Sequence, residues 1–359
     1  MPDAISVREA RPDEAPALLA LAAAVDAQSP YTLHEPGERP GWWTGARPAE
    51  DLAAFQRGNG TILLAEVGGK PAGYLTATGG RLRRTRGVVT AKLGVLPERQ
   101  GRGVGTRLLA AAEAWVRGRG GHRLELTVAA PNLRAHALYR RLGFVDEGRL
   151  RESLRLPEGF CDELILAKLF TPPDAPEWPP LLLEAPTPAP LAGSSIRAAQ
   201  PEDAAAYFAY DRAVRAETPF LLRPVEEGLP DVGAACRFLA GQCIDPQRVT
   251  FVAALDGGIA GSVSVWGGGT RRTAHDASLG LAVRRTCWGS GLGKRLLAAA
   301  EAWAMERGCR RLSFWVMGHN VRGRRFYAAC GFAEEAVCRR YALIDGRFAD
   351  HVAMAKRLP

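Results

Sequence analysis

The chain repeats itself at an offset of 188 or 189 residues, and this self-similarity constrains its fold more than any local motif. Residues 93–144 align without a gap on residues 281–332, with 24 of 52 positions identical. Earlier segments recur as well: 7–14 as 196–203, 29–33 as 218–222, and 61–73 as 250–261 with one residue lost. The repeat predicts two copies of one domain.

The length of 359 residues favours two domains of ordinary size. Between the copies, residues 171–194 hold eight prolines, which exclude a continuous helix or a central strand. We therefore expect an N-terminal domain over 1–170, a proline-rich linker over 171–194 and a C-terminal domain over 195–359. Trp178 and residues 181–183 are apolar, so we expect part of the linker to pack along a domain surface.

Composition narrows the class of protein. No run reaches the ~20 apolar residues of a membrane span, and the first residues lack the layout of a signal peptide, so we expect a cytoplasmic protein without a membrane partner. The seven cysteines are an odd number without CxxC pairs, which favours reduced thiols and no metal. The net charge of +9 suits a polyanionic cofactor, whereas the dispersed arginines do not favour nucleic acid.

Each copy predicts the same order of elements. A β-rich start leads to a helix with an acidic first turn, and then strand, tight turn and strand follow at 61–78 and 250–266. A third strand near 88–96 or 278–283 precedes an amphipathic helix, a further strand at 123–128 or 311–316, a short helix and a final hairpin. We expect an α/β fold whose mixed (α+β) sheet carries helices on both faces.

A glycine loop lies between the third strand and the amphipathic helix of each copy. Its sequence is QGRGVG at 100–105 and WGSGLG at 288–293. Glycines let the backbone approach a phosphate, and the unpaired amides of the first helical turn attract it. The loop is not a P-loop, because no Gly-Lys-Ser/Thr ending is present, and it lacks the context of a Rossmann fingerprint.

The whole constellation resembles the GNAT acetyltransferase superfamily. Val-x-Pro-x-x-Gln-Gly-x-Gly-x-Gly at 95–105 is followed by Asn132 and by LYRRLGF at 138–144, and the second copy offers Val283, GSGLG, Asn320 and FYAACGF at 326–332. The resemblance covers about 165 residues in each half. It implies two tandem acyl-CoA N-acyltransferase domains.

The resemblance also implies a site for acetyl-CoA, or another acyl-CoA, as co-substrate. The strand before the loop would splay from the next strand and pair with pantetheine, and the glycine loop would take the pyrophosphate. Asn132 and Asn320 would contact pantetheine, or would only cap the following helix. The matching positions are Leu93, Gly94, Val95, Gln100, Gly101, Arg102, Gly103, Val104, Gly105, Thr106 and Asn132, and then Leu281, Ala282, Val283, Gly289, Ser290, Gly291, Leu292, Gly293, Lys294 and Asn320.

Catalysis in such enzymes is direct attack of an amine on a thioester. Tyr139 and Tyr327 match the family's general acid, although a tyrosine at this helical spacing also suits core packing, and the backbone amide near Gly94 or Ala282 would stabilise the oxyanion. The base stays open. Candidates are Glu125, which alternation can turn away from the site, and then His275, Asp276, His319 or a chain of waters.

The copies differ at the loop. Gln100 and Pro97 of the first copy correspond to Trp288 and Arg285 of the second, and the family usually has glutamine or arginine at the loop's first position. We therefore expect the first copy to bind the cofactor more completely. Acceptor specificity comes from the least similar segments, among them GWWTGARP at 41–48, whose tryptophans would line a pocket or anchor a loop.

The leading expectation is an N-acetyltransferase for the amine of a small molecule. The alternatives are acetylation of a protein lysine or N-terminus, and an acyl-CoA-binding regulator without catalysis. The duplication predicts a pseudo-dimer within one chain. Such a chain can act as a monomer.

Overall fold

The structure is a computed structural model that describes residues 4–35, 38, 47–170, 175–188, 191 and 193–359. Its chain divides into two compact units. The first comprises Met1–Pro176 with Thr270–Arg272 and Cys338–Leu343, and the second comprises Glu177–Gly269, Thr273–Val337 and Ile344–Pro359. Apart from Thr270–Arg272 and Cys338–Leu343, the two units correspond to the two copies of the repeat. The domain bounds 1–170, 171–194 and 195–359 stay a prediction.

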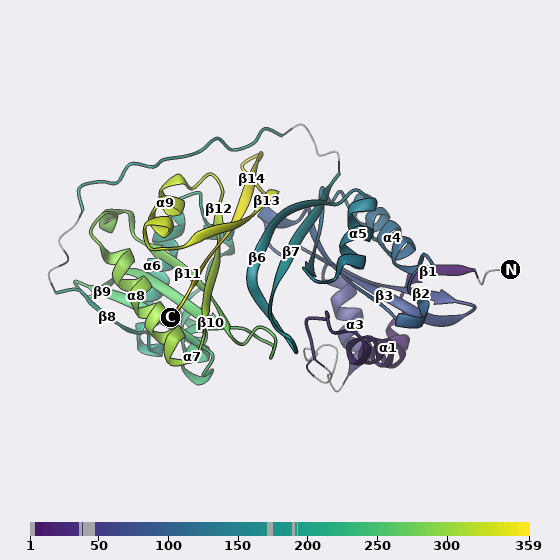
Figure 1. The fold of residues 1–359 in the computed structure, drawn as a ribbon. Coiled ribbons are helices and arrows are strands. Elements are labelled where there is room, and N and C mark those ends of the chain that lie inside the picture. The colour runs from purple at the N-terminus through teal and green to yellow at the C-terminus, as the bar shows by residue number, and fades with distance from the viewer. Residues whose placement is uncertain (1–3, 36–37, 39–46, 171–174, 189–190, 192) are drawn as a thin grey trace. The chain divides into compact units, whose positions relative to one another are not determined.

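The first unit holds a seven-stranded sheet in the order β1-β2-β3-β4-β5-β7-β6 (Figure 1). Only β4 and β5 run parallel, and the other recorded neighbours are antiparallel. The elements are β1 (Ile5–Glu9), α1 (Ala15–Gln28), α3 (Pro48–Arg57), β2 (Gly60–Val67), β3 (Lys70–Gly79), β4 (Val88–Val95), α4 (Val104–Gly118), β5 (Arg123–Ala129), α5 (Leu133–Arg141), β6 (Val145–Leu156) and β7 (Gly159–Leu169).

The second unit repeats this plan in the order β13-β14-β12-β11-β10-β9-β8, with β11 and β12 as its parallel pair. Its elements are β8 (Ser195–Ala198), α6 (Ala204–Ala216), α7 (Val232–Ile244), β9 (Arg248–Leu255), β10 (Gly258–Gly267), β11 (Asp276–Val283), α8 (Leu292–Glu306), β12 (Arg311–Met317), α9 (Val321–Ala329), β13 (Ala333–Ile344) and β14 (Arg347–Arg357). The expected mixed sheet and order of elements are confirmed.

Both faces of each sheet are covered. In the first unit α4 packs on one face and α1 with α3 on the other (Figure 1). Strand β2 shows the alternation, because Leu63 and Ala65 belong to the core under α4, whereas Ile62 and Leu64 belong to the core under α1. In the second unit α8 and α6 with α7 form the corresponding cores. This arrangement leaves the ends of the central strands free to carry a site.

The two tight turns have the geometry that their glycines predict. Gly68 and Gly69 have φ of 59° and 74°, and Asp256 and Gly257 have φ of 50° and 74°. Two successive residues with positive φ are characteristic of the type I′ turn, whose twist matches that of the flanking strands. The expected hairpins β2–β3 and β9–β10 are confirmed.

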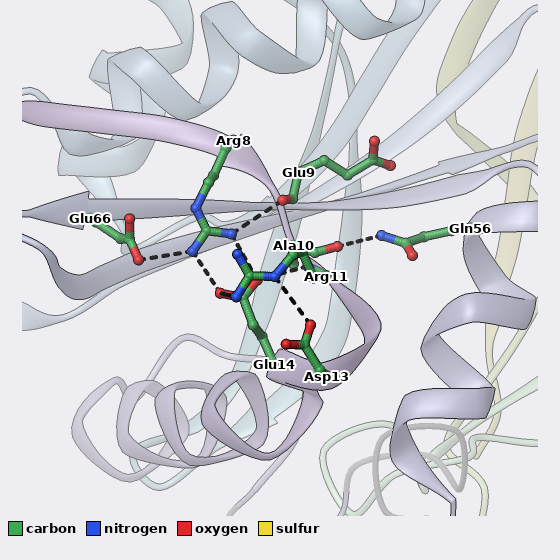
Figure 2. A network of polar contacts seen from close by, with 8 residues as sticks. All are labelled: Arg8, Glu9, Ala10, Arg11, Asp13, Glu14, Gln56 and Glu66. Atoms are coloured by element: carbon green, nitrogen blue, oxygen red, sulfur yellow. Dashed lines mark hydrogen bonds and ion pairs between the residues drawn. The ribbon is translucent and has the colours of Figure 1, made fainter.

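An ion-pair network fixes the entry of α1 (Figure 2). The Arg8 guanidinium donates to both carboxylate oxygens of Glu14 at 2.7 and 2.6 Å and reaches Glu66 at 3.0 Å. Glu14 also accepts from the backbone N–H of Arg11 at 2.8 Å. The hydrogen bonds from Arg8 hold the pKa of Glu14 down at about 2.

The second unit repeats the entry of its first helix with a different acid. Arg197 donates to both carboxylate oxygens of Asp203 at 2.7 Å. Asp203 accepts from the N–H of Gln200 at 2.8 Å, and these contacts lower its pKa. The acidic first turns that the sequence predicted therefore serve as charged caps.

Part of the proline-rich segment packs on the second unit. The Trp178 N–H donates to the Phe348 carbonyl at 2.7 Å, and its indole N–H donates to the Ile344 carbonyl at 3.1 Å. The Leu181 N–H donates to the His319 carbonyl at 2.8 Å. The expectation that apolar linker residues lie on a domain surface is confirmed.

Residues 41–46, which include Trp42 and Trp43, lie outside the part of the chain that the structure describes. No helix among the described residues is long and apolar enough to cross a membrane.

Candidate active site

The parallel strands of each unit pair only at their beginnings. Between β4 and β5 the pairing runs from Val88 with Arg123 to Thr90 with Glu125. Between β11 and β12 it runs from Asp276 with Arg311 to Ser278 with Ser313. Over the described ranges 91–95 and 279–283 no pairing with β5 or β12 is recorded, so one edge of each strand is open. The splayed strands that the resemblance implied are present in both units.

The hydrogen-bond alternation decides which backbone groups face each opening. Leu96 donates its N–H to the Ala72 carbonyl at 3.0 Å, so in the β3–β4 ladder Leu96 and Gly94 face β3. The groups of Leu93 and Val95 face the opening instead. Arg284 donates to the Ala260 carbonyl at 2.8 Å, which directs Leu281 and Val283 to the second opening in the same way. The amides of Gly94 and Ala282 themselves point into the ladder, and their neighbours face the opening.

The two glycine loops share one backbone conformation. Gly101 and Gly103 have φ of 78° and 88°, and Gly289 and Gly291 have φ of 83° and 87°. Gly103 and Gly291 are the N-cap residues of α4 and α8 and lie in the left-handed region that favours glycine. The first amides of both helices therefore leave the loop in the arrangement that binds anions.

Gln100 and Trp288 perform the same structural task. The Gln100 Nε2 donates to the Val95 carbonyl at 3.2 Å, and the Trp288 Nε1 donates to the Val283 carbonyl at 2.8 Å. Each side chain thus ties the loop to the last residue of the open strand. The indole N–H of Trp288 thus replaces the amide of Gln100 at this contact. The expectation that the first copy binds the cofactor more completely stays a prediction.

One real difference between the loops is Ser290, which stands where the first loop has Arg102. Its hydroxyl donates to the Cys287 carbonyl at 2.6 Å and accepts from the Leu292 N–H at 3.3 Å. One of the first amides of α8 therefore has a long internal hydrogen bond. Arg102, Ser290 and Leu292 are the predicted residues that do not line the cavities described next.

A cavity of about 1240 Å³ lies in the first unit, and one of about 1340 Å³ lies in the second. Each is lined by residues of its own unit. The predicted residues that line the first are Leu93, Gly94, Val95, Gln100, Gly101, Gly103, Val104, Gly105, Thr106, Asn132 and Tyr139. Those that line the second are Leu281, Ala282, Val283, Gly289, Gly291, Gly293, Lys294, Asn320 and Tyr327.

Tyr139 and Tyr327 line the cavities and also belong to the hydrophobic cores under α4 and α8. Their side chains are buried. Burial raises the pKa of Tyr139 to about 12 and raises the pKa of Tyr327 as well. Both phenols are therefore protonated at neutral pH, so each can donate a proton. Tyr139 and Tyr327 therefore pack in the core and can also act as acids at the cavities.

The asparagines cap their helices. Asn132 Oδ1 accepts from the Ala135 N–H at 3.1 Å, and Asn320 Oδ1 accepts from the Gly323 N–H at 2.9 Å. This is the N-cap role that the sequence left open. Because both residues also line their cavities, a contact from the side-chain amide to a ligand stays a prediction.

Sequence reasoning missed one pair of basic residues beside the loops. A guanidinium nitrogen of Arg134 lies 2.8 Å from the position that a Cβ at Gly101 would take. Arg322, at the equivalent position, lies 5.4 Å over the Trp288 ring and also lines its cavity. The signal was available, since each arginine follows its asparagine by two residues. Both can neutralise an anion at the loop.

A tyrosine ring covers the middle of each open strand, but it comes from different elements. In the first unit a Cβ at Gly94 would lie 2.7 Å from the ring of Tyr74 on β3. In the second unit Ser262 replaces Tyr74, Ala282 replaces Gly94, and Tyr210 of α6 donates its hydroxyl to the Ala282 carbonyl at 2.7 Å. Ser262 donates to the Tyr210 hydroxyl at 3.1 Å. The ring of Tyr210 thus fills the volume that the smaller Ser262 leaves where the first unit has Tyr74.

The base candidates named from the sequence do not line the cavities. Glu125 accepts from Thr90 at 3.1 Å and pairs with the buried Arg123 at 2.8 Å. Asp276 pairs with Arg311 at 3.1 Å. His319 stacks on Trp178 with ring centroids 5.1 Å apart, and His275 is buried away from the second cavity.

Three carboxylates that sequence reasoning missed line the first cavity. They are Asp26, which is buried on α1, Asp51 on α3, and Glu163 on β7, which accepts from Ser153 at 3.0 Å. Position on the final hairpin was the only sequence signal for Glu163. Within the described ranges, no cluster of three His, Cys, Asp or Glu residues could hold a metal ion.

The fold, the open strands and the anion-binding loops define a protein with two acyltransferase domains in tandem. The model of the Acetyltransferase (GNAT) family matches residues 27–144 and 212–332, once in each half of the chain. The matched segments cover more than half of the sequence, so the chain belongs to this family. It is accordingly an N-acetyltransferase of a family that uses acetyl-CoA.

The chain is similar to individual proteins as well. The chain is 31% identical over 147 residues to aminoglycoside N(6')-acetyltransferase type 1 of Stenotrophomonas maltophilia, a match that covers 39% of this chain and 86% of that protein. A solved GNAT acetyltransferase from Streptococcus pneumoniae is 32% identical, covering 46% of this chain and 99% of that one at a TM-score of 0.44. Ribosomal-protein-alanine N-acetyltransferase from Brucella melitensis is 25% identical, with the same coverage and a TM-score of 0.41.

Proposed function

We propose that each domain binds acetyl-CoA and that the enzyme transfers the acetyl group to the primary amine of a small molecule. The observation that carries this proposal is the pairing of an open strand with an anion-binding loop in each unit. Gly103 and Gly291 begin helices whose first amides can hold a pyrophosphate. Arg134 and Arg322 add positive charge beside the two loops.

The open strands suit an amide-bearing chain such as pantetheine. Leu93 and Val95 turn their backbone groups to the first opening, while Gln100 engages the Val95 carbonyl. The remaining groups can pair with the amides of an extended ligand as a further strand would. We assign the oxyanion donor to the N–H of Leu93 or Val95, and to Leu281 or Val283 in the second domain, because these face the opening.

Acetyl-CoA supplies the acetyl group as a thioester. Tyr139 holds a proton at the first cavity because its pKa is about 12, and it can give that proton to the departing sulfur. Asp26 and Glu163 lie where they can hold a protonated amine and accept its proton through water. Tyr327 has the corresponding role in the second domain.

The first cavity favours a small molecule. Its lining residues come from α1, α3 and the sheet, and its volume suits a ligand held within a cleft. The similarity to an aminoglycoside N(6')-acetyltransferase supports an amine of this kind.

The test is release of the CoA thiol over a panel of amines, with the acetylated product identified by mass. We expect thiol and N-acetyl product in equal amounts for a small amine, and a large loss in the double variant Tyr139→Phe/Tyr327→Phe. Turnover of peptides alone would favour protein acetylation. Acetyl-CoA binding without thiol release would instead indicate a regulator.

A further inference from the structure

The two cavities differ in aromatic lining at two equivalent positions. Thr78 and Thr127 line the first cavity, and Trp266 and Trp315 replace them in the second. Both indoles are substantially exposed, at 42% and 43%. Two exposed tryptophans that line one cavity have no role in the core, where Trp303 is buried. They are therefore available to a ligand.

The register places both indoles on one face of the sheet. Trp266 on β10 pairs with Ser278 on β11, and Ser278 pairs with Ser313 on β12. Trp315 follows Ser313 by two residues, so its side chain points to the same face. The two tryptophans thus lie on either side of β11, on the same face of the sheet.

Trp266 extends over the strand that separates it from Trp315. Gly280 stands on β11 where the first domain has Lys92, and ring atoms of Trp266 lie 3.9 Å from the position that a Cβ at Gly280 would take. Because Gly280 has no side chain, the indole of Trp266 can lie over β11 and line the cavity there.

Other aromatic rings line or border the same cavity. Trp315 stacks on His351 with ring centroids 5.0 Å apart and planes at 28°. Tyr207 and Phe238, which also line the cavity, stack with centroids 5.6 Å apart. Aromatic side chains such as these bind flat aromatic ligands by offset stacking.

The charges of the second cavity disfavour a cationic acceptor. Among the described residues that line it, Asp211 is the one carboxylate, and it pairs with Arg215 at 2.7 Å. Arg215 occupies the position of Asp26 in the repeat. A protonated amine in this cavity would lie near the guanidinium of Arg215. Among the described lining residues, no carboxylate besides Asp211 could remove its proton.

We propose that the second domain acetylates an uncharged aromatic amine, whose ring stacks on the exposed indoles of Trp266 and Trp315. The inference rests on the proposed function and names the substrate class of its second site. An amine bonded directly to a ring is unprotonated at neutral pH because the ring delocalises its lone pair. Its nitrogen forms the bond to the acetyl carbon as the carbon–sulfur bond of acetyl-CoA breaks. The nitrogen then loses a proton to water, and the sulfur takes one from Tyr327.

The experiment uses the full chain with its first loop blocked by Gly103→Val. Three acceptors are compared by thiol release: 4-methylaniline, 2-phenylethylamine, which keeps the ring but is protonated, and 1,4-diaminobutane, which is cationic without a ring. We expect 4-methylaniline to have the highest kcat/KM. Trp266→Thr and Trp315→Thr, which install the residues of the first domain, should each raise its KM about three- to tenfold.

Phe160→Thr is the matched control, since it removes a 38% exposed aromatic side chain that lines neither cavity, and it should leave that KM unchanged. Circular dichroism and acetyl-CoA affinity verify that the tryptophan variants fold. The inference is overturned if both tryptophan variants keep the wild-type KM for 4-methylaniline, or if 1,4-diaminobutane is preferred. Absence of thiol release from the second domain with all three amines also overturns it. The proposed function itself fails only if the unblocked chain is inactive too.

Discussion

The two glycine loops differ at three of their six positions yet have the same backbone conformation, whereas the two cavities are built on the same strand plan but carry different side chains. Gln100 and Trp288 show the first half of this contrast, because different side chains hold equivalent carbonyls. Asp26 and Arg215 show the second half, because equivalent positions carry opposite charges. On the proposed function, binding of a common co-substrate constrains the backbone, whereas the acceptor constrains side chains.

The largest expected effect separates the two catalytic centres. Tyr139→Phe should lower kcat of the first domain about 10²- to 10⁴-fold, which is the usual contribution of a positioned acid. Tyr327→Phe should do the same in the second. Each is measured by thiol release in a chain whose other loop is blocked. Unchanged rates in both variants would show that the tyrosines only pack the core.

The next effect concerns the loops. Gly103→Val and Gly291→Val force a β-branched residue to a φ near 88°, at a strain of about 1–3 kcal/mol, and place a side chain at the amides. We expect acetyl-CoA affinity at the altered loop to fall at least tenfold, measured by calorimetry.

Matched controls for these variants lie at the other end of the same helices. Gly120→Val and Gly308→Val meet the same kind of strain, at φ of 70° and 71°, with no atom within 4 Å of the new Cβ. They should leave acetyl-CoA affinity unchanged. Equal losses in the controls would mean that the loops act through stability alone.

A smaller effect tests the equivalence of Gln100 and Trp288. Gln100→Ala and Trp288→Ala each remove one hydrogen bond to the open strand, which is worth about 1 kcal/mol, so acetyl-CoA should bind roughly fivefold more weakly. Gln100→Trp should lose less, because an indole N–H makes the same contact in the second domain. A larger loss in Gln100→Trp than in Gln100→Ala would break the comparison.

The smallest effect concerns the helix entries and pH. The pKa of Glu14 is lowered to about 2 in the folded chain, so its pairing stabilises the fold above its ordinary pKa and is lost as the pH falls toward 2. Arg8→Ala should cost about 0.5–1 kcal/mol at pH 7, since the pair is partly exposed. Arg197→Ala should cost less, because Arg8 also reaches Glu66.

Urea unfolding at pH 7 and pH 2.5 measures both differences. The gap between wild type and Arg8→Ala should shrink at the lower pH. A gap that stays constant would mean that Arg8 contributes through packing rather than through its charge.

Much of the fold was predictable from local rules. The residue pairs Gly68-Gly69 and Asp256-Gly257 predicted the two turns, and the repeat predicted that one domain plan occurs twice. The loops, the open strands and the position of Tyr139 followed from motif order. These features depend on the backbone or on short spacings, which a sequence displays directly.

The rest depended on contacts between distant segments. Tyr210 of α6 takes over from Tyr74 of β3, although these residues are not equivalent in the repeat. Glu125 lies on the strand beside the opening but pairs with Arg123, while Glu163 reaches the cavity from the final hairpin. Such placements depend on which face of a strand is turned to the cavity, and a sequence leaves that open for strands buried on both sides.

The central claim is that both loops are competent acetyl-CoA sites despite their different side chains. Calorimetric titration of the chain with acetyl-CoA tests it directly, with each loop blocked in turn. We expect two sites per chain, of which Gly103→Val removes one and Gly291→Val removes the other. One site in the wild-type chain, lost with a single variant, would contradict it.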